Sequence, residues 1–477
     1  MSGNIKNFPD ICGNERKSRE INTEKNLYAP FSNIDFNKVR SAFGIALHMH
    51  QPTIPAGSGD LRTAPLISNL QHMMEHQNIG DNHNAPVFLW CYGRMSDFIR
   101  ELVEGGKNPR VMLDYSGNLL WGLSQMREED TLGKLRLIAS DKKYRRYVEW
   151  LGTMWSHATV TSTPVPDIRL HIEAWREHFA SIFGYGALER VRGFSPPEMH
   201  LPIHPDISYE YVKTLKECGY KWLMVQEHTI ENPGGGPVRM PYLPHRLVAK
   251  NSVGEIQEIT VLIKTQGSDT KLVAQMQPYY EAKTKDRVEY CSRSVPPFVL
   301  QISDGENGGV MMNEFPPAYK IAFAEIGKEG TVAMNGSEYL EFIFNMGIKE
   351  NGFNPVQPVM QHRIWEFVDD CSPGACDRAI TKAKEKYGGF NLERASWTND
   401  KNWVKGYEHV LDPINKLSAM FHAKFDNAKI NKTSNRAYRE ALLYLLLSQT
   451  SCFRYWGEGV WTDYAKEICR RGMETLA

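Results

Sequence analysis

The segment Phe43-Gly-Ile-Ala-Leu-His-Met-His-Gln-Pro52 opens the part of the chain whose pattern decides the fold. Its first five residues form a short apolar run typical of a buried strand, and a longer helical pattern follows. The same alternation continues, with predicted strands at Phe43–Leu47, Pro86–Trp90, Arg110–Asp114, Trp222–Val225, Ile259–Ile263 and Phe298–Ile302. Strands that alternate with helices are typical of a parallel sheet or barrel, so the sequence predicts an α/β fold.

Composition and charge exclude several classes of protein. The chain has 477 residues, and 56 Lys+Arg balance 56 Asp+Glu, so its formal net charge is zero. Nucleic-acid binders usually carry a basic excess, and no run approaches the roughly 18–20 apolar residues of a membrane helix. The N-terminus lacks a secretory apolar core, and eight cysteines are too few for a disulfide scaffold. We therefore expect a soluble, cytoplasmic protein with no nucleic-acid or membrane partner.

The pattern predicts three regions. Residues 1–40 are polar with little periodicity, which indicates a lead-in that is partly disordered or straps the main domain. Residues 41–395 hold the alternating strands and helices. Residues 396–477 lack strand-like runs and predict a C-terminal three-helix bundle. Helices are expected at 168–183, with Asp167 as its N-cap, and at 403–425, 435–449 and 461–475.

Two histidines end the first predicted strand. His48 and His50 lie two residues apart, so on a strand they project to the same face at its carboxyl end, where barrel enzymes keep their sites. As metal ligands they would fit a spacing seen in many hydrolases. As imidazoles they could instead hydrogen-bond a polyhydroxylated ligand. The spacing alone leaves both alternatives open, together with a purely structural role.

Two carboxylates follow stiff or sharply turning segments. Glu198 comes after Pro196-Pro197, which restrict the backbone, so its carboxylate is held in place as a nucleophile requires. Asp304 ends the strand at 298–302 and precedes a glycine, which suits an acid at the strand's carboxyl end, with Glu306 two residues further. The alternatives are an exposed loop glutamate and an ordinary Asp-Gly turn.

Other polar and aromatic residues stand at the edges of apolar runs. His157, Glu227 and His228 occupy such positions, as expected if successive strands deliver their end residues to one site. Aromatic side chains at such positions could stack on a ligand. The aromatic candidates near strand ends are Trp90, Tyr115, Trp121, Trp155 and Trp222. Cys371 and Cys376, spaced C-x4-C without a second pair, are only a weak metal or disulfide candidate.

Four motifs, taken in order, resemble those of glycoside hydrolase family 57. They are H-x-H-Q-P at 48–52, G-x-M-x-x-H at 152–157, G-F-x-x-P-E at 193–198 and S-D-G-E-N-x-G at 303–309. The resemblance runs from about Phe43 to Trp456. It implies an incomplete seven-stranded (β/α) barrel followed by a helical bundle. It also implies activity on α-glucans, of the α-amylase or 4-α-glucanotransferase type, with no metal and no cofactor.

The resemblance assigns roles to individual residues. Glu198 matches the family's nucleophile and Asp304 its general acid/base, the pair that a retaining enzyme needs for double displacement. Glu227 and His228 match a segment lining the same pocket. The residues expected to bind substrate are His48, His50, Gln51, His157, Glu227, His228 and Glu306.

The sequence also departs from the family pattern. Ser195 stands where the family usually has a tryptophan, and Cys452-Phe453 where its last motif typically has Asp-Trp. These departures leave an altered substrate range open. Two other functions remain as alternatives: a metal-dependent polysaccharide deacetylase-like enzyme, prompted by His48 and His50, and a sugar-binding protein without catalysis.

Overall fold

The structure is a computed structural model. It describes residues 8–21, 25–265, 270–306, 309–327, 329–392 and 406–477. The predicted boundary between residues 395 and 396, residues 403–405 of a predicted helix, and Asn307 and Gly308 of the fourth motif lie outside these ranges.

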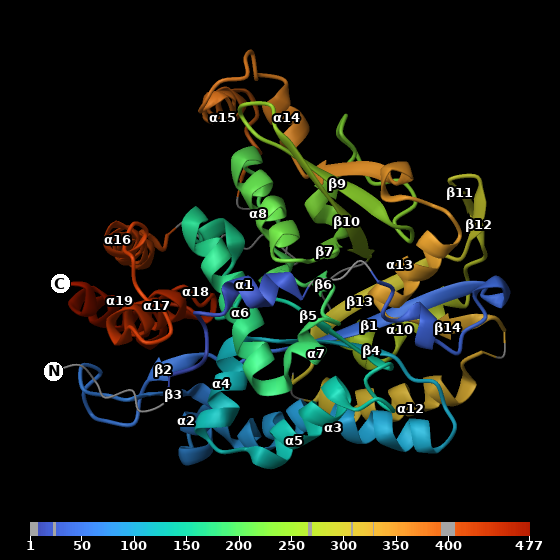
Figure 1. The fold of residues 1–477 in the computed structure, drawn as a ribbon, viewed down its shortest axis with the longest axis horizontal. Helices are drawn as coiled ribbons and strands as arrows, with labels where there is room; N and C mark the ends of the chain where they lie inside the picture. The colour runs from blue at the N-terminus through green and yellow to red at the C-terminus, as the bar shows by residue number, and fades with distance from the viewer. Residues whose placement is uncertain (1–7, 22–24, 266–269, 307–308, 328, 393–405) are drawn as a thin grey trace.

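The centre of the molecule is an 11-stranded mixed sheet (Figure 1). Parallel pairing links seven of its strands in the order β5, β4, β1, β13, β10, β7 and β6. A parallel bridge between Gly152, just after β5, and Phe194 of β6 then joins the two ends of this series. The bounds are β1 Ser41–Met49, β4 Val111–Tyr115, β5 Val148–Leu151, β6 Gly193–Phe194, β7 Trp222–Gln226, β10 Ile256–Lys264 and β13 Phe298–Asp304.

The remaining strands extend this sheet or form hairpins. β9 (His245–Lys250) runs antiparallel to β10, and β15 (Asn354–Pro358) lies parallel to β9 and antiparallel to β8 (Ile230–Glu231). β14 (Thr331–Ala333) pairs with the start of β1. The two hairpins are β2 (Thr53–Pro55) with β3 (Leu66–Ser68) and β11 (Val288–Tyr290) with β12 (Arg293–Val295).

Alternate residues of the central strands belong to two different cores. In β1, Phe43, Ile45 and Leu47 pack in the larger core, whereas Ala42 and Ala46 pack in the smaller one. The smaller core also holds the strand residues Met112, Leu151, Trp222, Met224, Leu262, Phe298, Leu300 and Ile302. Because side chains alternate along a strand, a residue two positions beyond any of these faces the same side of the sheet.

Helices cover the sheet on several sides. In Figure 1, α3 (Ala85–Glu104), α5 (Glu129–Ser140) and α12 (Phe315–Glu325) lie together along the lower side, and α6 (Val165–Phe183) and α8 (Pro205–Glu217) lie on another. The other helices are α1 Glu15–Glu20, α2 Asn69–Glu75, α4 Gly117–Gln125, α7 Tyr185–Leu188, α9 Thr270–Ala274, α10 Gln277–Ala282, α11 Val310–Asn313, α13 Gly336–Asn345, α14 Gln361–Trp365 and α15 Ala375–Lys386.

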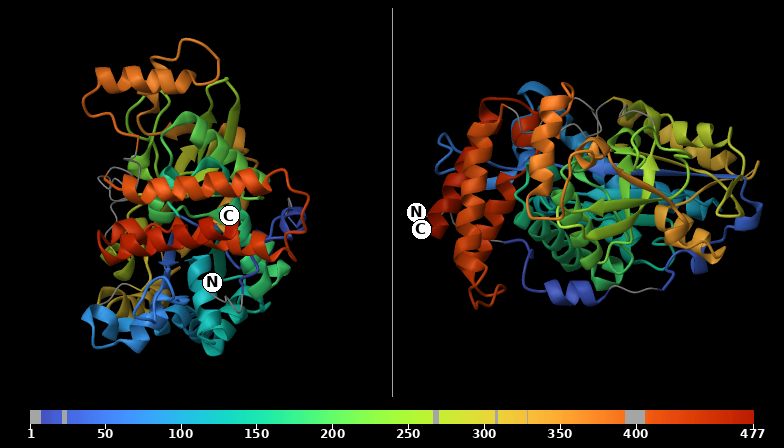
Figure 2. Two further views of the ribbon diagram at one scale, coloured as in Figure 1. Left: turned by 90° about the vertical axis from the view of Figure 1, so that its left-hand side faces the viewer. Right: turned by 90° about the horizontal axis from the view of Figure 1, so that it is seen from above.

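The C-terminal part of the described chain is helical. Figure 2 shows α16 (Glu408–Phe425), α17 (Arg436–Ser448) and α19 (Val460–Leu476) side by side at one end of the molecule, and these three helices pack on one another. The short α18 (Cys452–Tyr455) connects α17 to α19. None of the helices that the structure describes is both long enough and apolar enough to cross a membrane.

Five of the six predicted strands are confirmed, and one is wrong. Pro86–Trp90 forms the start of α3, with Pro86 in its first turn. Buried Tyr92, Met95 and Ile99 follow at helical spacing, so this apolar run belongs to an amphipathic helix. The predicted N-cap Asp167 is also wrong, because α6 begins at Val165 and Asp167 lies inside its first turn.

Candidate active site

A cavity of about 220 Å³ lies where the carboxyl ends of β1 and β13 meet the loop after β6 and the short helix α18. It gathers most of the site residues expected from the sequence. The lining residues are His48, His50, Gln51, Phe88, Asp114, His157, Ser195, Pro196, Glu198, Met199, Ile302, Asp304, Glu306, Cys452, Tyr455 and Trp456. Glu198 and Asp304, the two expected catalytic carboxylates, therefore face the same space.

Strand alternation explains why three charged residues meet there. His48 lies two residues beyond Ala46 in β1, and Asp304 lies two residues beyond Ile302 in β13. Asp114 follows Met112 in the same way in β4. The pairing places His48 directly between the other two, opposite Asp304 on one side and Asp114 on the other. On this face, each of the three strands is thus apolar except for the last residue that it contributes to the face, which is polar.

The acidic side of the cavity consists of His48, Asp114, Asp304 and Glu306. His48 Nδ1 lies 3.1 Å from Asp114 Oδ2. Burial by itself lowers the pKa of His48, but the charge and hydrogen bond of Asp114, together with the charges of Asp304 and Glu306, raise that pKa to about 9. The imidazole of His48 is therefore protonated at neutral pH.

Both acids at the end of β13 hold their protons more tightly than usual. Burial raises the pKa of Asp304, against the opposing charge of His48. Burial and the charge of Asp304 raise the pKa of Glu306 to about 8. Glu306 Oε1 also accepts a 2.9 Å hydrogen bond from the backbone N–H of His50, which ties this loop to the end of β1.

The neutral side of the cavity consists of His50, His157 and Cys452. The rings of His50 and His157 stack with centroids 4.3 Å apart and an interplanar angle of 15°. Burial lowers the pKa of both imidazoles well below 6.5, and the charge of His48 adds to this effect. Burial and the charge of Glu198 raise the pKa of the Cys452 thiol. These three side chains are therefore uncharged at neutral pH.

Serine hydroxyls orient the two neutral imidazoles. His50 Nδ1 lies 2.7 Å from Ser116 Oγ, at the start of α4, and His157 Nδ1 lies 2.7 Å from Ser451 Oγ. The backbone of Ser451 also donates to the His157 carbonyl, at 3.3 Å. The segment before α18 is thereby fixed against the loop after β5.

Glu198 stands on a single turn of 3-10 helix, η5 (Pro197–Met199), directly after β6. Its φ of 57° and ψ of 19° place it in the left-handed region, which costs a non-glycine residue energy and often marks a functional position. At the start of β6, a Cβ on Gly193 would lie 2.3 Å from the Trp222 ring, so the strand that delivers Glu198 requires glycine there.

The structure places Glu227 and His228 elsewhere. They line a second cavity of about 390 Å³ together with Gln226, Ile230 and Glu231. The expectation that they line the same pocket as Glu198 is therefore corrected. β7 ends at Gln226, and the chain then turns through η6 (Glu227–Thr229) into β8, which pairs with β15.

The aromatic lining also differs from the expectation. Tyr115, Trp121, Trp155 and Trp222 are buried in the cores, and Trp90 lies on α3 outside the set of lining residues. Phe88, Tyr455 and Trp456 line the cavity instead. Burial and the charges of Glu198 and Asp304 raise the pKa of Tyr455, which lines the same cavity as both carboxylates.

Sequence reasoning missed Asp114, Tyr455 and Trp456. Strand alternation is the signal that could have found Asp114. It places this residue on the same face as Met112, which precedes it by two residues in a predicted strand. Tyr455 and Trp456 follow Cys452-Phe453, where the sequence already departs from the family pattern. Only the folded structure shows that these two residues reach the cavity.

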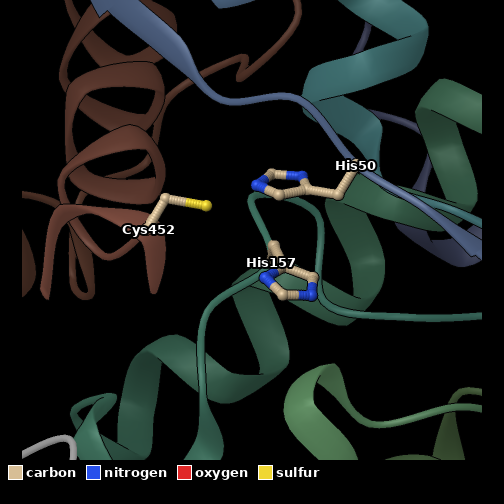
Figure 3. Close-up of side chains that lie close together, drawn as sticks. All are labelled: His50, His157 and Cys452. Carbon is tan, nitrogen blue, oxygen red and sulfur yellow. The ribbon is translucent and has the colours of Figure 1, made fainter. Parts of the chain in front are cut away.

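Two groups of three side chains in the described residues could hold a metal ion. The first is His50, His157 and Cys452, whose potential ligand atoms all lie within 4.8 Å of one another (Figure 3). The second, His204, Asp206 and Asp377, lies outside the cavity. His48, which the sequence paired with His50 as a possible ligand, belongs to neither group.

Comparison with known proteins identifies the class and then the family. The model of glycosyl hydrolase family 57 matches residues 19–306, more than half of the chain. The matched model describes a family of glycosyl hydrolases, which defines the class. The chain belongs to glycosyl hydrolase family 57. Comparison with curated protein sequences gave no match.

Solved structures share the fold at low sequence identity. A 4-α-glucanotransferase from Thermococcus litoralis aligns with a TM-score of 0.55 and 18% identity over 92% of this chain and 59% of its own. A branching enzyme from Pyrococcus horikoshii gives 0.51 and 13% over 91% of this chain and 88% of its own. An α-amylase from Thermotoga maritima gives 0.51 and 11% over 91% and 93%, respectively. This chain thus spans 59% of the length of the first of these structures.

Proposed function

We propose that this chain is a retaining enzyme that acts on α-glucans, as a hydrolase or a 4-α-glucanotransferase. The observation that carries the proposal is that Glu198 and Asp304 line one cavity at the carboxyl ends of parallel strands. Family membership and the activities of the similar structures support the choice of substrate. A retaining enzyme needs two carboxyl groups about 5–5.5 Å apart on either side of the bond that it cleaves.

Glu198 acts as the nucleophile in this proposal. Its carboxylate attacks the anomeric carbon, a C–O bond forms to the enzyme, and the bond to the leaving oxygen breaks. The preceding Pro196-Pro197 and the left-handed backbone of Glu198 support this role, because they fix the direction of the side chain. Fixed geometry is what an in-line attack requires.

Asp304 acts as the general acid and then as the base. It gives its proton to the leaving oxygen, and later removes a proton from the acceptor that attacks the glycosyl-enzyme. Burial supports this role, because it raises the pKa of Asp304 and so favours the protonated form. Water as the acceptor gives hydrolysis, and the hydroxyl of another sugar gives transfer.

The remaining lining residues are proposed to position the sugar. His48, His50, Gln51, His157 and Glu306 offer polar groups to its hydroxyls. Tyr455 and Trp456, which are 42% and 41% exposed, offer ring faces on which a pyranose can stack. Ser195 also lines the cavity, at the position where the family usually carries an aromatic ring. Glu227 and His228 can reach only the part of a substrate that enters the second cavity.

The finer description of the fold belongs to the same proposal. The seven parallel strands and the bridge from Gly152 to Phe194 support the incomplete (β/α) barrel of the family. The packing of α16, α17 and α19 supports a C-terminal bundle. We retain 1–40, 41–395 and 396–477 as the proposed regions. All eight cysteines are free thiols, which supports a cytoplasmic location.

Substitution of each carboxylate tests the mechanism. Glu198→Gln is expected to lower turnover of maltooligosaccharides by about 10⁴-fold or more, because the covalent intermediate cannot form. Asp304→Asn is expected to lower turnover by about 10²- to 10⁴-fold. The matched control is Glu289→Gln, which changes an exposed glutamate on β11 and should leave turnover unchanged.

The covalent glycosyl-enzyme and the turnover of bound sugar distinguish a retaining enzyme from a protein that only binds sugar. Mass spectrometry of Asp304→Asn with an activated glycosyl fluoride should reveal a glycosyl group on Glu198. Full turnover in Glu198→Gln would contradict the assignment of the nucleophile. Wild-type protein that binds maltooligosaccharides by calorimetry without turning them over would instead identify a sugar-binding protein.

A further inference from the structure

We infer that His50, His157 and Cys452 form a binding site for a thiophilic divalent cation, Zn²⁺, on the neutral side of the cavity. The three side chains come from segments far apart in the sequence: the end of β1, the loop after β5 and the start of α18. Their potential ligand atoms nevertheless lie within 4.8 Å of one another. Figure 3 shows a ring nitrogen of His50 and the sulfur of Cys452 facing each other across a short gap.

The site is built from side chains that water scarcely reaches. His50, His157 and Cys452 are 8%, 5% and 4% exposed. His50 Nε2 is buried, and within the described part of the chain it has no hydrogen-bond partner. Leaving a buried polar atom without a partner is energetically unfavourable. A metal ion at this position would satisfy that nitrogen.

The surroundings of His50 prepare that nitrogen for a metal ion. Ser116 Oγ lies 2.7 Å from the other ring nitrogen, Nδ1, and can accept a hydrogen bond from its N–H group. In that tautomer Nε2 carries a lone pair directed away from Ser116. Metal-binding histidines commonly have their second nitrogen held by such a hydrogen bond.

The set of donors selects the ion. Two imidazoles and a thiolate are borderline and soft ligands, which suit Zn²⁺ and not Ca²⁺ or Mg²⁺, whose ligands are oxygens. Ligand atoms around a tetrahedral Zn²⁺ lie roughly 3.3–3.6 Å apart, so atoms that lie within 4.8 Å of one another have to approach by at most about 1.5 Å. Binding replaces the thiol proton of Cys452 by the metal and releases that proton to solvent.

Three protein ligands leave one position of a tetrahedral ion open. Structural zinc sites use four protein ligands, whereas sites that act on substrates keep one position for water or substrate. All three ligands line the cavity that also contains Glu198, so the open position faces the space proposed for the sugar. A sugar hydroxyl or a water molecule would take it. His48 is not among the proposed ligands, because it does not belong to the group whose potential ligand atoms lie within 4.8 Å of one another.

Metal binding to the full chain can be measured without any substrate, so its outcome does not depend on the proposed function. Protein treated with chelator, then supplied with one equivalent of Zn²⁺ and dialysed, is expected to retain about one zinc ion per chain by elemental analysis. With Co²⁺ in place of Zn²⁺, the wild type is expected to show a thiolate-to-cobalt charge-transfer band and tetrahedral d–d absorption.

Variants identify the ligands. Cys452→Ser is expected to lose the charge-transfer band and to weaken Zn²⁺ binding by at least about 100-fold, and His50→Gln to weaken it similarly. The control is the double variant Cys291→Ser/Cys371→Ser, which removes the two exposed thiols. It should keep the band and the affinity, which separates this site from adventitious binding to surface thiols. Circular dichroism checks that each variant is folded.

Three results would overturn the inference. One is wild-type protein that retains no zinc after dialysis. Another is a cobalt complex without a thiolate band. The third is loss of zinc in the control variant but not in Cys452→Ser. The first two are read on the wild type, so a misfolded variant cannot obscure them. Loss of turnover in Glu198→Gln together with no zinc would leave the proposed function standing and remove only the metal site.

Discussion

His48 and His50 lie two residues apart, yet the two sides of the cavity give them opposite charge states. On the acidic side, Asp114 raises the pKa of His48 to about 9, against the effect of burial. On the neutral side, burial lowers the pKa of His50 well below 6.5, and the charge of His48 lowers it further. The partner of His50 Nδ1 is a serine hydroxyl, whereas the partner of His48 Nδ1 is a carboxylate.

The difference shows which property sequence spacing controls. An H-x-H spacing places both imidazoles on one face, because side chains alternate along a strand. Their protonation depends on neighbours that other strands and loops supply. His48 lies between β4 and β13, and the last residue of each of these strands on this face is an aspartate, Asp114 in β4 and Asp304 in β13. Past the end of β1, His50 meets His157 and the segment before α18.

Among the variants that test this comparison, the largest effect is expected when the acidic side loses the partner of His48. Asp114→Asn should lower kcat/KM on maltooligosaccharides by about 100-fold, because a hydrogen bond to a charged group contributes about 1.5–3 kcal/mol. Steady-state kinetics measure this loss. The counterpart on the neutral side is Ser116→Ala, which removes the hydroxyl beside His50 Nδ1 and should cost less than 10-fold. Equal losses in the two variants would contradict the division of the cavity into two sides.

A buried acid away from the cavity provides the next test. Glu149 of β5 accepts hydrogen bonds from the backbone N–H and the hydroxyl of Ser337, and burial raises its pKa to about 7 from the usual 4.5. The folded protein therefore keeps a proton that the unfolded chain has lost above pH 4.5. The wild type should lose stability as pH rises from 4.5 to 7, and this loss is complete above pH 7.

Glu149→Gln has no such proton to lose. The free energy of unfolding of this variant, relative to wild type, should rise by about 2 kcal/mol between pH 5 and pH 7. Denaturant unfolding at the two pH values measures the change, with exposed Glu289→Gln as the control. A pH-independent difference would show that Glu149 is ionised in the folded protein.

Local pattern was enough to predict much of the fold and of the acidic side. Apolar runs identified β1, β4, β7, β10 and β13, because strands buried on both faces are nearly continuous in apolar residues. The same rule failed at Pro86–Trp90, where an apolar run of similar length starts a helix. Periodicity over so few residues does not distinguish the two.

His50 and His157 were expected at the site, but their arrangement with Cys452 was beyond prediction because it depends on tertiary packing. His157 has a φ of 62°, and Ser451 holds its ring from a segment near the C-terminus. A bridge between Ala158 and Thr450 joins the same two segments. No local spacing relates His157 to Cys452, so their approach to His50 appears only in the folded chain.

The smallest effect is expected in the second cavity. Glu227→Gln changes a residue that lines the second cavity, beyond β7, and not the cavity that contains the acidic and neutral sides. As for other substitutions away from a site, kcat/KM on short maltooligosaccharides should therefore stay within about 3-fold of wild type. Kinetics with short and long substrates provide the measurement. A loss confined to long substrates would show that a glucan chain extends into the second cavity. A loss as large as that of Asp304→Asn on short substrates would return Glu227 to the catalytic cavity and show that this cavity is larger than its lining residues indicate.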